Sequence, residues 1–78
     1  MKNLELTKQY ALVTFTKTVL ERCNPEIVEE SDSIDKLQDY YDSGCSESGS
    51  VGYTIIEKTE NGLEDYFSGE KFEMKSYN

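Results

Sequence analysis

The segment from Leu4 to Cys23 carries an apolar pattern that fits two kinds of secondary structure. When its residues are placed at intervals of about 100°, the apolar side chains gather on one wide arc and most threonines lie opposite them. The stretch Val13–Val19 also alternates as a strand does and is rich in β-branched residues. Because the arc continues over the longer stretch, the pattern predicts an N-terminal helix that ends before Asn24-Pro25.

The segment at 24–43 predicts a second helix with a narrower apolar seam. Asn24-Pro25 suits the first positions of a helix, whereas a break at residues 31–33 would leave a short helical turn followed by a helix that begins near Ser33. Both alternatives remain open. Ser43-Gly44 ends the helix in either case. The seam positions recur at intervals of three or four residues: Ile27, Ser31, Ile34, Leu37 and Tyr41.

The C-terminal part of the chain predicts a β-meander. Asn61-Gly62 is the strongest short signal for a hairpin turn, and Gly69-Glu70 suits a second tight turn. Taken as two-residue turns, they pair Lys58 with Asp65 across the first hairpin. They also align three apolar residues on one face: Ile56, Phe67 and Phe72. We therefore expect three antiparallel strands between residues 51 and 77.

Together these elements predict an α+β fold in one small domain, residues 1–78. An N-terminal helix and a second, acidic helix pack on a three-stranded antiparallel β-meander. The helical part covers residues 3–43, a connector of small residues covers 44–50, and the meander covers 51–77. A chain of this size buries only about 60% of its unfolded surface, which leaves little material for a deep active-site cleft.

The composition then excludes several classes of function. The chain has 16 acidic and eight basic residues and no histidine, so the usual proton shuttle of catalysis at neutral pH is absent. Cys23 and Cys45 are expected to be free thiols, and their spacing does not match a metal site. We expect no enzyme activity, no catalytic residue, no cofactor and no metal. No segment resembles a membrane span or a secretory signal, which predicts a cytoplasmic location.

The distribution of charge indicates the kind of partner. Residues 24–50 hold eight acidic residues and one lysine, a net charge of −7 out of the total of −8. A strongly acidic chain is repelled by nucleic acids and anionic membranes and is attracted by basic protein surfaces. On a helix, the four aspartates from Asp32 to Asp42 share one face, in a row about 15 Å long. The predicted partner-binding residues are these and their neighbours: Glu29, Glu30, Asp32, Asp35, Asp39, Tyr40 and Asp42. A solvated helix face that serves only solubility remains the alternative.

Small size, strong acidity, the absence of histidine and six tyrosines resemble the small inhibitors that bacteriophages encode against host defence, which include anti-CRISPR proteins and DNA-mimic inhibitors. The resemblance is one of general character and carries over no individual residue. It implies a non-enzymatic inhibitor, acting in the host cytoplasm, that occupies the basic nucleic-acid-binding groove of a larger protein. The alternative is a small regulatory or antitoxin-like subunit that docks by apolar contacts. A monomer and a homodimer are both compatible with the sequence.

Overall fold

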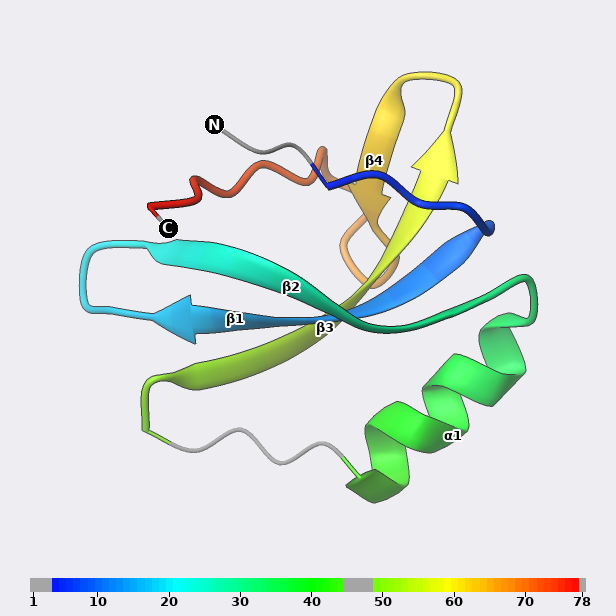
Figure 1. The fold of residues 1–78 in the computed structure, drawn as a ribbon, viewed down its shortest axis with the longest axis horizontal. Helices are drawn as coiled ribbons and strands as arrows, with labels where there is room; N and C mark the ends of the chain where they lie inside the picture. Colours follow the sequence, from blue (N-terminus) through cyan, green and yellow to red (C-terminus); the bar gives the residue numbers. More distant parts are fainter. Residues whose placement is uncertain (1–3, 45–48, 78) are drawn as a thin grey trace.

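Five elements of secondary structure are found in the part of the chain that the structure describes. The computed structural model describes residues 4–44 and 49–77, so most of the predicted connector lies outside the described residues. Within these two ranges the four strands make one antiparallel sheet in the order β2-β1-β3-β4, and one helix packs against it (Figure 1). The predicted arrangement of two helices on three strands is therefore wrong. The elements along the chain are β1 (Tyr10–Lys17), β2 (Arg22–Ser31), α1 (Ile34–Gly44), β3 (Val51–Thr59) and β4 (Gly62–Asp65).

The predicted N-terminal helix is wrong because its central part is strand β1. This strand pairs with β2 along one edge and with β3 along the other, so it lies inside the sheet. Ala11, Leu12 and Val13 are all 0% exposed, since both faces of the sheet are covered at this point. A strand buried on both faces is apolar without interruption, and such a run also fills one arc of a helical wheel. The β-branched alternation of Val13–Val19 is the signal that the structure follows.

The first half of the predicted second helix is also wrong, because residues 22–31 form β2. Asn24-Pro25 lies at a break in the β1–β2 register that falls between Thr14 and Thr16, and Asn24 has a φ of 52°. Proline removes a backbone donor from a strand and is therefore confined to edge strands and irregular positions. β2 provides both conditions, so the residues that suggested a helix start instead mark an irregularity at the edge of the sheet.

Helix α1 confirms the predicted helix start near Ser33 and its end at Ser43-Gly44, whereas the short helical turn predicted before it is wrong because those residues belong to β2. It spans 11 residues, and the described part of the chain contains no helix long and apolar enough to cross a membrane. Its inward side chains all come from the predicted seam: Ile34, Leu37 and Tyr41. The local pattern was sufficient for this element because only one face of α1 is buried.

The predicted hairpin forms between β3 and β4, but the position predicted for its turn, Asn61-Gly62, is wrong because the turn residues are Glu60-Asn61. Thr59 pairs with Gly62, so the turn lies one residue earlier and the predicted Lys58–Asp65 pair is wrong. The Thr59 hydroxyl accepts a hydrogen bond from Asn61 N at 3.2 Å, which closes the turn at that position. Gly62 has a φ of 112°, a conformation that only glycine adopts without strain.

The predicted third strand of the meander is wrong, because β4 ends in a turn organised by Asp65. The Asp65 carboxylate accepts hydrogen bonds from Phe67 N at 2.9 Å and from Ser68 N at 3.1 Å. These bonds stabilise a turn in place of a straight strand. Phe67 consequently leaves the row of apolar residues that the predicted register assigned to it.

After this turn, residues 70–77 form a tail that contacts both outer edges of the sheet. Phe72 N donates to Leu63 O of β4 at 2.8 Å, and Asn24 N of β2 donates to Lys75 O at 2.8 Å. Between these two points the tail runs beside the N-terminal segment, on the side of the sheet away from α1 (Figure 1). The tail therefore closes the face that α1 leaves uncovered.

Two apolar clusters hold the layers together, one on each face of the sheet. The cluster under α1 consists of Leu12, Leu37 and Ile55, with aromatic side chains packed around them. The cluster on the other face contains four buried residues against which the N-terminal segment and the tail pack: Leu6, Ala11, Val13 and Ile56. Neighbouring residues of β1 thus contribute to opposite clusters, as the alternation of a strand requires.

Gly52 allows the close approach of β3 to an aromatic ring of β1. A Cβ at this position would lie 2.6 Å from Cζ of Phe15 and would also contact Cε2 of the same buried ring. We expect Gly52→Ala to lower the free energy of unfolding by about 1–3 kcal/mol, because the ring has no space into which to move. Urea unfolding followed by circular dichroism measures this change.

Gly44→Ala is the matched control, since a Cβ there would meet the Tyr40 ring at 3.7 Å, an ordinary contact. It should change the stability by no more than about 0.5 kcal/mol. Equal losses in the two variants would contradict the role given to Gly52.

Candidate functional site

Three aspartates form a row along the exposed part of α1. Leu37 is fully buried and marks the inner side of the helix, whereas Asp35, Asp39 and Asp42 are exposed. At about 100° per residue, the three aspartates fall within an arc of about 60°. The structure therefore brings together three members of the predicted acid row. The fourth, Asp32, precedes the helix.

Two glutamates of β2 lie on the same side of the sheet as α1. Glu29 pairs with Leu12 and Glu26 pairs with Thr14, and directly paired residues of antiparallel strands point to the same face. Leu12 belongs to the cluster beneath α1, so both glutamates lie on that side. They share a face although they are three positions apart, because Val28 is an extra residue at a shift in the register.

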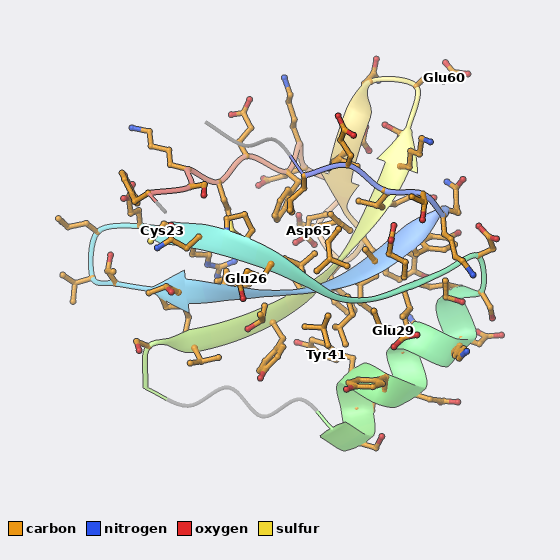
Figure 2. The ribbon with its side chains drawn as sticks, in the orientation of Figure 1. Cys23, Glu26, Glu29, Tyr41, Glu60 and Asp65 are labelled. Atoms are coloured by element: carbon orange, nitrogen blue, oxygen red, sulfur yellow. The ribbon has the colours of Figure 1, made fainter. Side chains whose placement is uncertain are left out.

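We refer to these five exposed residues as the acidic surface: Glu26, Glu29, Asp35, Asp39 and Asp42. Figure 2 shows Glu26 and Glu29 along β2, with Glu29 near α1. Glu26 was not among the predicted binding residues. Its position follows from the bulge in β2, which no local pattern of the sequence indicates.

Glu30 and Asp32, which were predicted to bind a partner, form hydrogen bonds within the protein. Glu30 accepts from Thr7 N at 2.7 Å through Oε1 and from the Thr7 hydroxyl at 3.2 Å through Oε2. Asp32 Oδ1 accepts from Gln9 N at 2.9 Å. These carboxylates thereby attach the N-terminal segment to the end of β2. They stabilise the fold, and we do not include them in the acidic surface.

Tyr40 lies apart from the acid row. The helical period places it about 100° from the nearest aspartate, Asp39, on another side of α1. Its ring lies along the last turn of the helix, where a Cβ on Gly44 would meet it at 3.7 Å. Tyr40 is 44% exposed and remains accessible, but the helix does not present it beside the carboxylates.

An aromatic cluster next to α1 was not predicted. The rings of Tyr10 and Tyr66 lie 6.0 Å apart, those of Tyr66 and Phe67 5.7 Å apart, and those of Phe67 and Tyr41 5.1 Å apart. Phe67 is nevertheless 52% exposed. The predicted register placed it opposite Ile56, on the other face. The turn at Asp65 was the available signal, since aspartate at the end of a strand favours a turn.

Among the described residues, two tyrosines have raised pKa values, and neither belongs to the acidic surface. Burial raises the pKa of Tyr10, and the charge of Glu57 adds to the effect. A hydrogen bond to Glu21 raises the pKa of Tyr77, and burial contributes further. Both shifts favour the neutral phenol and move its titration further from neutral pH. They do not create an acid–base catalyst.

The described residues offer little else for chemistry. No three or more of their acidic and cysteine side chains are arranged to hold a metal ion. Cys23 is a free, buried thiol, as predicted, while Cys45 lies outside the described residues. An open groove beside the tail is lined by residues of both charge signs, among them Glu21, Arg22 and Lys75. The acidic surface is the feature with a consistent chemical character.

The different roles of the acidic residues can be separated by their effects on stability. Glu30→Ala/Asp32→Ala should lower the free energy of unfolding by about 1–2 kcal/mol, because it removes the acceptors that hold the N-terminal segment. Asp39→Ala/Asp42→Ala should leave stability unchanged or raise it by a few tenths of a kcal/mol, since it relieves repulsion and removes an anion from the C-terminal end of a helix. Thermal unfolding of both variants provides the comparison. A similar loss in both would show that the helix aspartates also stabilise the fold.

Comparison of the chain with models of known protein families found no match. Comparisons with curated proteins and with solved structures found none either.

Proposed function

We propose that this chain is a non-enzymatic inhibitor that binds the basic nucleic-acid-binding groove of a larger protein through its acidic surface. This is the mode of action expected of a phage-encoded anti-defence protein of the anti-CRISPR or DNA-mimic type. The observation that carries the proposal is the exposed row of Asp35, Asp39 and Asp42 on one side of α1. Glu26 and Glu29 extend the same sign of charge across the neighbouring strand.

The spacing of the row suits a surface that normally holds phosphates. Residues three or four positions apart on a helix lie about 5–6 Å from each other. Phosphates along one strand of a duplex provide one charge per ~3.4 Å of helix axis. Both spacings are of a few ångströms, so long, flexible lysine and arginine side chains that contact neighbouring phosphates can also reach neighbouring carboxylates of the row.

The row has a cost for the isolated protein. Like charges at neighbouring helix positions repel by about 0.2–0.5 kcal/mol per pair. A basic partner removes this repulsion on binding, and the field of the acidic surface also accelerates the encounter. The repulsion between the aspartates therefore lowers the stability of the isolated protein, and binding to a cationic surface would offset this loss.

The packing of α1 favours binding as a rigid unit. Leu37 packs against Leu12 and Ile55, and the ring centres of Tyr41 and Phe67 lie 5.1 Å apart. These contacts fix the direction in which the aspartates point. A preorganised surface loses less conformational entropy when it binds than a flexible segment does.

A regulatory or antitoxin-like subunit that docks by apolar contacts is the second candidate. The half-exposed Phe67, next to Tyr41, is the observation that favours it. Aromatic side chains are enriched in protein interfaces, and a partly exposed phenylalanine gains most from being covered. In this case the acidic residues would serve solubility alone.

Charge reversal tests where the binding surface lies. Asp35→Lys/Asp39→Lys/Asp42→Lys should weaken binding to immobilised poly-lysine, and to a basic host protein retained by the wild-type chain, by about tenfold or more. Glu60→Lys/Glu70→Lys/Glu73→Lys changes the net charge equally but lies outside the acidic surface, with Glu60 at the tip of the β3–β4 hairpin, away from α1 (Figure 2). Surface plasmon resonance measures both affinities. Equal weakening by the two triple variants would show that only net charge matters. In a separate displacement experiment, failure of the wild-type chain to displace nucleic acid from the retained protein would exclude inhibition by occlusion.

The salt dependence of binding separates the two candidate functions. Binding through the acidic surface should weaken steeply as the salt concentration rises from about 0.05 M to 0.3 M, because screening shortens the range of the field. Phe67→Ser should then have only a small effect. The apolar alternative predicts the reverse, a flat salt dependence and a large loss of affinity for Phe67→Ser.

A further inference from the structure

The apex of the β1–β2 hairpin exposes two branched aliphatic side chains. Val19 is 102% exposed and Leu20 is 92% exposed, so neither is covered by the rest of the protein. Exposed large apolar side chains gain free energy when they leave water. Figure 1 shows this turn projecting from the molecule on the opposite side of the view from α1.

The turn that carries these side chains is fixed by Thr18. Its hydroxyl oxygen accepts hydrogen bonds from Leu20 N at 3.2 Å and from Glu21 N at 3.0 Å, and the same hydroxyl lies 3.0 Å from Glu21 O, to which it donates. Thr18 N also donates to Glu21 O at 2.8 Å. The two aliphatic side chains therefore project from a defined turn.

The C-terminal tail supports the hairpin just below the apex. Tyr77 donates its phenolic proton to the Glu21 carboxylate, and Tyr77 N donates to Asn24 Oδ1 at 2.6 Å. The ring of Tyr77 is still 61% exposed. An amphipathic aromatic ring thus lies beside the base of the turn, with its hydroxyl directed at a carboxylate.

Cationic residues form the next level below the apex. Lys17 and Arg22 are paired directly across the hairpin, and the Arg22 guanidinium lies 5.3 Å from the centre of the Phe15 ring. Lys75 of the tail forms an isolated parallel β-bridge with Cys23, the residue that follows Arg22 in β2. Along the hairpin the order is therefore two aliphatic side chains, then a bound carboxylate and a tyrosine, then three cations.

We propose that this apex is a contact site for an anionic phospholipid surface. Val19 and Leu20 enter the boundary of the acyl chains, while Lys17, Arg22 and Lys75 lie at the level of the phosphates and Tyr77 lies at the interface. This order of groups matches the order of a bilayer from its hydrocarbon to its headgroups. A convex apex also needs no shaped cavity to receive it, which a protein pocket would have to provide.

The net charge of −8 predicts repulsion from anionic membranes, but it treats the protein as a single point. The nearest member of the acidic surface, Glu26, is opposite Thr14, which is three residues before Lys17 at the proposed level of the phosphates. At the rise of a strand this is about 10 Å, somewhat more than the Debye length of about 8 Å at physiological salt. A membrane at the apex therefore meets the local cations before it meets the acidic surface.

Vesicle sedimentation tests the proposal. The wild-type chain should bind vesicles of phosphatidylcholine that contain about 30% phosphatidylserine, and it should bind pure phosphatidylcholine less tightly. Val19→Ser/Leu20→Ser should reduce the partition coefficient about tenfold or more, because it removes the inserted groups. Lys17→Gln/Arg22→Gln should abolish the preference for phosphatidylserine. Val28→Ser, at an exposed valine away from the apex, is the matched control and should bind as the wild type does.

A second readout reports insertion directly. The chain contains no tryptophan, so Leu20→Trp introduces a single reporter at the apex. Its emission should shift to shorter wavelength when phosphatidylserine vesicles are added. If the wild-type chain does not sediment with these vesicles, the proposal is overturned, and a pocket of a partner protein becomes the site that receives Val19 and Leu20. Equal losses in the apex and control variants, or an unshifted emission, would also overturn it.

Discussion

Strand β1 has to be covered on both of its faces, and the rest of the structure is arranged around this requirement. Leu12 faces α1 and Val13 faces the N-terminal segment and the tail, and both are completely buried. A 78-residue chain has little apolar material for two separate clusters. One helix covers one face, and the two ends of the chain together cover the other. The tail also contacts the outer edges of β2 and β4, which reduces the unpaired edge of the sheet.

This arrangement decides where the charges lie. α1 must turn Leu37 toward the sheet, which turns Asp35, Asp39 and Asp42 outward. The bulge at Val28 brings the glutamates of β2 to the same side. The hairpin apex lies at a distance from the row on α1, and three cations, Lys17, Arg22 and Lys75, lie below it together with the Glu21 carboxylate. An acidic chain thus has a local region of the opposite character, which a single net charge does not describe.

The two proposed contacts use different physical interactions. The acidic surface acts through a field, so its effect depends on ionic strength and it favours rapid encounter. The apex acts mainly through removal of two aliphatic side chains from water, with the cations orienting the contact. Both sites include residues of β2, but α1 and the apex of the β1–β2 hairpin lie on opposite sides of the view in Figure 1, so a partner at α1 leaves the apex accessible.

Part of this protein was determined by its sequence alone. The charge excess of residues 24–50, the absence of histidine, the helix from near Ser33 to Gly44 and the presence of a hairpin near Asn61-Gly62, though not its register, all follow from local composition or short motifs. So does most of the acid row, since a helix buried on one face has a clear period. These features depend on neighbouring residues, which the sequence lists directly.

Only the tertiary structure decided the remainder. The apolar run around Leu12 indicates burial in either a helix or a strand, and coverage from both sides made it a strand. The side occupied by Glu26 depends on a bulge, and the pairing of Lys58 with Leu63 in place of Asp65 depends on the register of β3 with β4. Each outcome is set by contacts between segments distant in the chain. Local periodicity records which side chains favour burial but not how many layers cover them.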